Sequence, residues 1–325
     1  MKLRIFTEPQ QGAGYLDLLA VAQRAEKLGF DAFFRSDHYQ RMGTHFDGMP
    51  GPSDAWITLA GIARETSTIR LGTLVNSSTF RNPGVLAISI ANVDSMSNGR
   101  VELGLGAGWY LDEHGSYGIP FPPAGERMDR LEEAIHVVKA LWSDGPQSFD
   151  GRYYKFKDVE LFPKLLQKKL PIYVGGNNFN NITRAVKWGD GWLPAGIHVD
   201  RVRAGVKMLK EEADKAGRDW REIEVCPQFV VHVGKTHEQA VENFRKSQMN
   251  KHLVSLQKST LKGQGTATHE EINLIGTPAE IVEKAQAFKE AGVTHLLGLY
   301  FAANSVQELI DQMQIFGEEV IPKVK

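Results

Sequence analysis

Residues 69–106 read IRLGTLVNSSTFRNPGVLAISIANVDSMSNGRVELGLG, and this stretch decides the fold class. Its two apolar runs, at 69–75 and 101–106, predict buried strands. Pro83 suits the first turn of a helix between these strands, and Asn98-Gly99 predicts the turn that follows the helix. A strand, a helix and a second strand in this order form a βαβ unit, so the stretch indicates an α/β protein with a parallel sheet.

The same alternation of short apolar runs and amphipathic helices continues along the whole chain. Eight strands are expected, at residues 3–8, 31–36, 69–75, 101–106, 171–176, 191–194, 224–233 and 295–301. Helices are expected at residues 17–28, 54–66 (with Ser53 as the cap), 83–96, 126–142, 202–216, 238–247, 277–291 and from 305 onward. No Pro-, Ser- or charge-rich linker divides the chain. We therefore predict one (β/α)8 TIM barrel over residues 1–325, with an open doubly wound sheet as the alternative.

Two stretches do not fit a βα unit. Residues 148–163 are polar and aromatic, and they predict an inserted hairpin or loop. Residues 248–275 are polar and interrupted by glycines, and they are too long for an ordinary connection. We interpret residues 248–275 as an insertion or lid at the C-terminal mouth of the barrel.

The composition narrows the class of protein. The chain has 325 residues, of which 42% are hydrophobic, and a formal net charge of −1. It can bury a large core, and it lacks the basic field that nucleic-acid binding needs. No apolar run approaches the ~18 residues of a membrane span, and the sequence turns acidic at Glu8 before a signal-peptide core could form. We expect a cytoplasmic protein whose partner is a small molecule, and neither a membrane nor a nucleic acid.

Several kinds of chemistry are disfavoured. Cys226 is the one cysteine, so no intrachain disulfide can form, and its apolar neighbours predict a buried, inert thiol. His45 and Asp47 could join Asp37 and His38 in a metal cluster, but their spacing is not typical of metal ligands, and we expect no metal. The chain has no GxSxG elbow, so nucleophilic hydrolysis is not expected.

The functional residues of a parallel barrel gather at the C-terminal ends of its strands. The second expected strand ends in Asp37 and His38. A carboxylate beside an imidazole can orient the ring or bind a polar ligand edge, and histidine exchanges protons near neutral pH. Alternatively, Asp37 caps a turn and His38 is a surface histidine. At a barrel strand end we favour the functional interpretation.

The third and fourth strands also end in groups that packing does not require. Asn76 begins a polar run, NSST, that offers amide and hydroxyl partners to a ring system. The small residues at 106–108 would let a flat ligand lie close to the backbone, beside Trp109 or Tyr110. Gly104, Gly106 and Gly108 have GxGxG spacing, which excludes a Rossmann fingerprint, because that needs GxGxxG and a helix at the glycines. Ordinary loops are the alternative for both segments.

Gly175 and Gly176 end the fifth strand, just before a helix. Glycines at this place free backbone N–H groups to point at an anion, which is a common way to hold a phosphate. Alone the signal is weak, but its place at a barrel strand end strengthens it.

Four stretches carry a resemblance to a known family: FRSDHYQRM, DAWITLAGIARETSTIRLGTLV, GRVELGLGAGWYLDEHGSYGIPFPP and GTPAEIVEKAQAFKEAGVTHLL. In this order they resemble the luciferase-like superfamily of flavin and deazaflavin enzymes, in its coenzyme F420-dependent oxidoreductase branch. The resemblance runs from the first strand to about Pro194 and resumes at residues 275–301. Residues 200–274 carry little recognisable pattern.

The resemblance implies a role for each strand end. It implies that Asp37 contacts the edge of the cofactor ring and that His38 lies beside the reactive carbon as the catalytic proton-transfer group. A third-strand bulge, with a non-proline cis peptide between Leu74 and Val75, would support the back of the ring. The expected cofactor-binding residues are Asp37, Leu74, Val75, Asn76, Gly106, Ala107, Gly108, Trp109, Gly175 and Gly176.

One position departs from the family pattern. Some members of the family have a catalytic Glu just after the fourth-strand glycines, where this chain has Trp109. The acid–base role of that Glu cannot be transferred to tryptophan. Glu113 and His114 lie nearby in the sequence and are candidate substitutes.

The leading hypothesis is hydride transfer between coenzyme F420 and a small organic substrate. An FMN-dependent monooxygenase that uses reduced flavin and O2 is the alternative, and a non-catalytic flavin-binding protein is a third. The anionic F420 tail would favour basic side chains along its exit groove, with Arg35, Arg41 and Arg81 as candidates. The substrate pocket would come from residues 39–53, 109–123 and 248–275. The family also implies a homodimer.

Overall fold

The computed structural model describes residues 1–42, 51–176, 179–256 and 268–325. Its central sheet runs, among strands joined by hydrogen bonds, in the order β11-β10-β12-β1-β2-β3-β4-β7-β8-β9, and every pair is parallel. Its strands are β1 Lys2–Thr7, β2 Ala32–Arg35, β3 Arg70–Ser77, β4 Val101–Gly106, β7 Ile172–Gly175, β8 Gly191–Leu193, β9 Glu224–Val225, β10 Gln228–Val233, β11 Leu274–Gly276 and β12 His295–Phe301.

The sheet closes into a barrel because β9 and β10 are two halves of one strand. β9 pairs with β8, and β10 pairs with β12. Across the junction, the N–H of Cys226 donates to the carbonyl of Trp192 (2.9 Å), and the N–H of Leu297 donates to the carbonyl of Pro227 (3.2 Å). The sequence predicted one strand over 224–233, and Pro227, which has no N–H to donate, interrupts it. With β9 and β10 counted as one strand, and with β11 set apart as an addition beside β10, eight of the described strands form the barrel, and the predicted eight-stranded barrel is confirmed.

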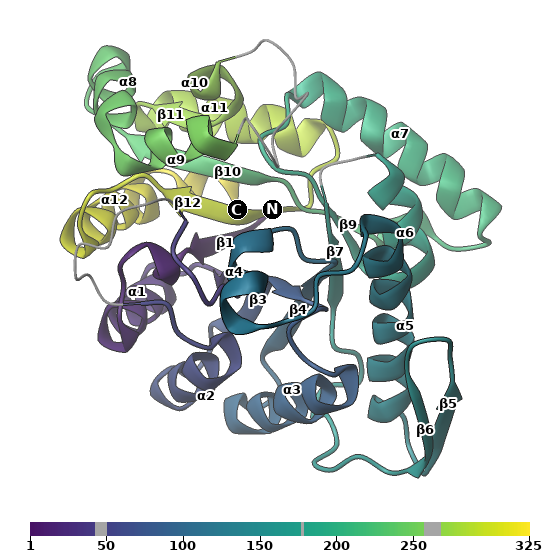
Figure 1. Cartoon of the computed structure of the whole chain (residues 1–325). Coiled ribbons are helices and arrows are strands. Elements are labelled where there is room, and N and C mark those ends of the chain that lie inside the picture. Colours follow the sequence, from purple (N-terminus) through teal and green to yellow (C-terminus); the bar gives the residue numbers. More distant parts are fainter. Residues whose placement is uncertain (43–50, 177–178, 257–267) are drawn as a thin grey trace.

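The helices form a ring outside the strands (Figure 1). They are α1 Tyr15–Leu28, α2 Ala55–Glu65, α3 Pro83–Ser97, α5 Ala124–Trp142, α6 Asn180–Trp188, α7 Val199–Lys215, α8 His237–Lys246, α11 Pro278–Glu290, α12 Val306–Glu319 and the short α13 Ile321–Val324. The cap of α2 differs from the prediction. Asp54, and not Ser53, accepts hydrogen bonds from the N–H groups of Trp56 and Ile57, because a carboxylate at this position reaches two free N–H groups at once.

The described residues form three buried apolar clusters, of which two position the strands of the barrel. Between the strands and the helices lies a large layer of aliphatic and aromatic side chains that includes Phe33, Leu59, Ile90, Leu103 and Phe316. Inside the barrel lies a smaller cluster of side chains from several strands: Phe6, Ala32, Phe34, Leu74, Tyr173, Leu193, Cys226 and Leu297. The interior is therefore a packed core, and ligands can enter only at its ends.

Three segments of the chain add elements to the barrel. The expected hairpin is present as the antiparallel pair β5 Gln147–Asp150 and β6 Lys155–Val159, which projects beyond α5 (Figure 1). A short helix that the sequence did not predict, α4 Leu111–Tyr117, follows β4.

The third addition lies within the stretch 248–275. It contributes α9 Gln248–Leu256, α10 His269–Ile272 and β11, and β11 extends the sheet beside β10. A role of this stretch as a lid stays a prediction. In the part of the chain that the structure describes, no helix has both the length and the apolar character to cross a membrane.

Candidate active site

Asp37 lies at the C-terminal end of β2, and its carboxylate is 1% exposed. The guanidinium of Arg81 donates to both carboxylate oxygens of Asp37, with Nη1 2.6 Å from Oδ2 and Nη2 3.1 Å from Oδ1. The same guanidinium contacts the carboxylate of Asp54 and donates to the hydroxyl of Tyr39 (2.6 Å) and to Oδ1 of Asn76 (3.1 Å). A bidentate pair of this kind fixes Asp37 firmly at the barrel mouth.

These contacts shift the pKa values of the group. Burial alone would lower the pKa of Arg81, but Asp37, Tyr39 and Asp54 together outweigh burial and raise the pKa of Arg81 above its ordinary value. Burial favours the neutral form of Asp54, yet Arg81 and the N–H of Ile57 lower the pKa of Asp54 below its ordinary value. Burial and the charge of Asp37 raise the pKa of Tyr39, so its hydroxyl keeps its proton.

His38, the next residue, contacts a carboxylate from an unpredicted element. Its Nδ1 lies 2.8 Å from Oε1 of Glu113 on α4. Glu113 is 1% exposed, and its other oxygen accepts the backbone N–H of Tyr39 (3.1 Å). A buried carboxylate on Nδ1 orients the imidazole and leaves Nε2 as the nitrogen that can exchange a proton with a ligand. The two rings of Trp109 and Tyr110 meet the His38 ring edge to face, with centroids 5.8 and 6.4 Å away.

His114 has a structural place beside this pair. Its Nδ1 lies 2.7 Å from the carbonyl of Tyr110, and its Nε2 lies 2.7 Å from the hydroxyl of Thr79. The Thr79 hydroxyl is in turn 2.6 Å from that of Ser77. His114 is fully buried, so it ties α4 to the end of β3 and holds Glu113 against His38.

The third strand contains the expected bulge. The β3–β4 register shifts between Thr73 and Asn76, and the peptide bond between Leu74 and Val75 is cis, as the resemblance implied. The bulge places the half-buried Val75 side chain over the neighbouring strands. A Cβ added to Gly106 would lie 2.8 Å from one methyl carbon of Val75. A Cβ added to Gly175 would lie 3.0 Å from each of the two methyl carbons of Val75.

These strand-end glycines therefore make room for protein groups. Gly106 and Gly175 accommodate Val75, and a Cβ on Gly108 (φ +77°) would lie 2.7 Å from the hydroxyl of Ser77. Gly176 has φ +144°, and a Cβ there would meet the amide of Asn181. From the sequence we expected a flat ligand to lie directly on these glycines. In the structure a ligand at this place would rest on Val75 and beside Ala107 and Trp109, which is 37% exposed.

The mouth also holds several polar atoms that are buried and have no hydrogen-bond partner among the described residues. They are Oε2 of Glu8, Nε2 of Gln10 and Gln11, Oε1 of Gln40, Oγ of Ser78 and Nε2 of His252. Nε2 of His252, on α9, lies 3.5 Å from Oε2 of Glu8. Buried polar groups in proteins are nearly always satisfied, so this set is suited to a polar ligand. None of Glu8, Gln10, Gln11 and His252 was predicted, because isolated polar residues carry no sequence motif.

The three basic candidates for a cofactor tail all have contacts within the protein. Arg35 is fully buried and donates to the hydroxyls of Ser53 (3.0 Å) and Thr58 (2.5 Å), and burial lowers its pKa to about 10. Arg81 holds Asp37, and Arg41 donates to the carbonyl of Gln11 (2.8 Å). Arg35 and Arg81 thus build the site from inside. His45 and Asp47 lie outside the described residues.

Comparison with known proteins agrees with this geometry. The luciferase-like monooxygenase family matches residues 1–295. The chain belongs to this family. An F420-dependent glucose-6-phosphate dehydrogenase of Amycolatopsis mediterranei is 29% identical, over 96% of this chain and 95% of that protein. One from Kineococcus radiotolerans is 30% identical, over 85% and 84%. The resemblance inferred from the sequence is thereby confirmed.

Solved structures of the luciferase-like fold superpose over the whole chain. An F420-dependent secondary alcohol dehydrogenase in complex with an F420–acetone adduct has a TM-score of 0.82 and 25% identity, and covers 100% of this chain and 99% of its own. The F420-dependent tetrahydromethanopterin reductase of Methanopyrus kandleri, at 21% identity and a TM-score of 0.79, shows the shared fold.

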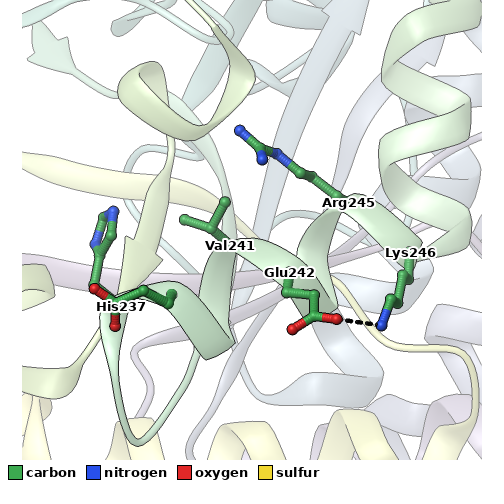
Figure 2. Close-up of a pocket in the computed structure, with 6 residues that line it drawn as sticks. His237, Val241, Glu242, Arg245 and Lys246 are labelled. Carbon is green, nitrogen blue, oxygen red and sulfur yellow. Dashed lines mark hydrogen bonds and ion pairs between the residues drawn. The ribbon is translucent and has the colours of Figure 1, made fainter.

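A separate surface hollow does not belong to this family site. Figure 2 shows it on α8, lined by His237, Glu238, Val241, Glu242, Arg245 and Lys246. Glu242 and Lys246 pair with each other across 2.5 Å, and Arg245 pairs with Glu270 across 2.5 Å. The hollow shares no residue with the groups around Asp37 and His38.

Proposed function

We propose that this protein is a coenzyme F420-dependent oxidoreductase that transfers a hydride between F420 and a small organic substrate. The observation that carries the proposal is the contact between His38 and the buried Glu113 at the barrel mouth, 2.8 Å long. The names of the similar dehydrogenases, and of the alcohol dehydrogenase with its F420–acetone adduct, support F420 as the cofactor. The substrate class is a small carbonyl compound or alcohol, because such a group exchanges one hydride and one proton.

The residues present fit this cofactor. The Leu74–Val75 bulge presents an apolar side chain on which a flat ring can rest, and Ser78 offers a buried hydroxyl with no partner among the described residues. Gly176, with φ +144°, would hold a phosphate through its backbone before α6. Asp37 would contact the ring edge, with Asn76, Gly106, Ala107, Gly108, Trp109 and Gly175 around it. When bound, F420 supplies or accepts the hydride through its deazaflavin ring.

His38 would move the proton that accompanies the hydride. Its Nδ1 is held by Glu113, so Nε2 gives a proton to a developing alkoxide or takes one from an alcohol. The negative charge of Glu113 stabilises the imidazolium that forms in the second case. Trp109 and Tyr110 flank the ring and restrict its rotation. Glu113 thus assists His38 in a chain that has tryptophan where some relatives have glutamate.

The second candidate is an FMN-dependent monooxygenase, which the description of the family favours. The two candidates differ in the cofactor, so the test is a titration of the purified protein with F420 and, separately, with FMN. Tighter binding of F420 supports the proposal, and tighter binding of FMN would overturn it.

A variant tests the role of His38. We expect His38→Ala to bind F420 with little change while F420-coupled turnover of carbonyl compounds or alcohols falls by about 10²–10⁴-fold, the usual contribution of general acid–base catalysis. His136→Ala, which removes an exposed histidine on α5, is the matched control and should keep full activity. Unchanged turnover in His38→Ala would remove His38 from the mechanism.

A further inference from the structure

A second polar cluster lies inside the barrel at the end opposite to the candidate active site. It comes from the first residues of five strands and includes Arg4, Glu102, Tyr173, Glu224 and His295. Nη1 of Arg4 lies 2.8 Å from Oε2 of Glu102 and 2.7 Å from the hydroxyl of Tyr173. The N-terminal end of a barrel usually serves stability, yet this cluster holds a set of groups with metal-ligand chemistry.

Three of the side chains bring one ligand atom each to a common point. Nε2 of His295 lies 3.3 Å from Oε1 of Glu224, and Sγ of Cys226 lies 3.8 Å from Oε2 of the same residue. One ligand atom from each of the three residues can be chosen so that all lie within 4.8 Å of one another. Atoms bound tetrahedrally to Zn²⁺ by bonds of about 2.0–2.3 Å are roughly 3.3–3.8 Å apart. The arrangement therefore needs only small side-chain adjustments to receive an ion.

The hydrogen bonds around His295 decide which of its two ring nitrogens carries the proton. The hydroxyl of Thr294 donates to the carbonyl of Val225 (3.2 Å) and accepts the N–H of Val225 (2.9 Å). Nδ1 of His295, 2.8 Å from this hydroxyl, is therefore the protonated nitrogen. With the proton on Nδ1, the lone pair of the ring lies on Nε2.

That lone pair has no hydrogen-bond partner among the described residues, although His295 is only 5% exposed. Nε2 faces a carboxylate oxygen of Glu224, which is a second acceptor. The other oxygen of Glu224 accepts the hydroxyl of Tyr173 (2.7 Å) and lies 3.6 Å from Nη1 of Arg4. Two acceptors that face each other at a largely buried place leave room for a cation between them.

We propose that Glu224, Cys226 and His295 form a binding site for a transition-metal dication of the zinc class. A thiolate, an imidazole and a carboxylate are the ligands that Zn²⁺ takes, and three protein ligands leave a fourth position for water. Glu224 is 25% exposed, which gives the ion a path from solvent. The ion would join β9 to β12 where the barrel closes, so its role is structural.

The charges around the three residues leave binding to direct ligation. The carboxylates of Glu102 and Glu224 already meet Arg4, and Arg70 at the rim also contacts Glu102. Thiolate is the form of cysteine that binds a metal, so the Cys226 thiol gives up its proton when the ion enters. The ion therefore adds one net positive charge, which its bonds to Glu224, Cys226 and His295 must offset.

The test uses untagged full-length protein, treated with a chelator and then titrated with Co²⁺ alone. We expect the near-ultraviolet charge-transfer absorption of a thiolate–cobalt bond, with one proton released per ion, and competition by Zn²⁺. Zn²⁺ should also raise the melting temperature. Cys226→Ser and His295→Gln should abolish the absorption, while His237→Gln, an exposed histidine on α8, should keep it.

Two further variants test the same site if Cys226→Ser does not fold. Glu224→Gln changes a partly exposed ligand and should weaken Zn²⁺ binding at least tenfold. Thr294→Val removes the hydroxyl on Nδ1 of His295 and should weaken it by about 10–100-fold, the usual effect of such a supporting group. No cobalt–thiolate absorption in the wild-type protein, or the same absorption in Cys226→Ser, would overturn the proposal. The first result would mean that a proton between Glu224 and Nε2 of His295 satisfies both atoms, and the second that the absorption does not come from Cys226, the one cysteine of the chain.

Discussion

Replacement of Glu113 by glutamine tests the link between the buried carboxylate and the candidate catalytic histidine. The Glu113 carboxylate is 1% exposed and accepts from two groups, Nδ1 of His38 (2.8 Å) and the N–H of Tyr39 (3.1 Å). An amide has nearly the same shape but one oxygen. If this oxygen keeps the Tyr39 N–H, the NH2 group faces Nδ1 of His38 and favours the ring tautomer with the proton on Nε2.

The size of the effect follows from that change of tautomer. A ring that carries its proton on Nε2 cannot take one from an alcohol, and glutamine cannot stabilise the imidazolium. We expect the rate constant for turnover in the alcohol-oxidising direction to fall by about 10²–10⁴-fold, or about 3–5 kcal/mol in activation free energy. The affinity for F420 should change little, because no cofactor contact is removed.

The assay is steady-state turnover as a function of pH, together with ¹⁵N NMR of the His38 ring. In Glu113→Gln the NMR spectrum should report the proton on Nε2, while in the wild-type protein it should report a protonated Nδ1. Asp112→Asn, an exposed neighbour on the same helix, is the control and should behave like wild type. Turnover of Glu113→Gln within about twofold of wild type, with an unchanged ring tautomer, would refute the reasoning.

Three further predictions concern the walls of the site. Gly106→Ala should lower the free energy of unfolding by about 1–3 kcal/mol through contact with Val75, and a second change, Val75→Ala, should restore most of the loss in urea denaturation. Gly104→Ala, whose Cβ would lie 2.2 Å from the backbone oxygen of Thr73, should not be rescued by Val75→Ala, and rescue there would contradict the packing argument. The pKa of Asp54 is lowered in the folded state, so its carboxylate stabilises the fold at pH values above the ordinary Asp pKa. This stabilisation is lost as the pH falls through the lower pKa of the folded state. Asp54→Asn should therefore flatten the fall in the free energy of unfolding from neutral to acidic pH. Arg81→Ala should cost about 3–5 kcal/mol in thermal or urea unfolding, because it leaves the buried Asp37 unpaired, and a loss below 1 kcal/mol would speak against the pair.

The fold could be predicted because its signals are local and repeated. Each strand is a short apolar run, and Pro83 and Asn98-Gly99 mark helix boundaries within a few residues of those observed. The break at Pro227 was missed because an apolar run on both sides hides it. The cap of α2 was misplaced by one residue because Ser53 and Asp54 both suit the position, and only the structure shows that Ser53 instead meets Arg35.

The candidate site could be predicted only in part. Asp37 and His38 were found because strand ends of a barrel share one mouth, and the Leu74–Val75 cis bond came from the resemblance. The partners of the pair lie 44 and 75 positions away, at Arg81 and Glu113, and no local pattern connects such distances. Gly106 and Gly175 were identified, but the reason why glycine is needed there was not predicted. The Val75 side chain fills the space above them, and this contact depends on the register of the strands.

The barrel has one cluster of buried polar groups at each of its two ends. At the mouth, Arg81 holds Asp37 through both of its oxygens, and Glu113 holds Nδ1 of His38, so Nε2 of His38 is the ring nitrogen that can meet a ligand. At the opposite end, Arg4 and Tyr173 hold Glu102 and Glu224 in the same manner. Phe6, Phe34, Leu74 and Leu193 form an apolar layer inside the barrel. Because that layer excludes water and charge, each cluster keeps its own protonation chemistry, and a change at one end reaches the other only through the stability of the strands that both share.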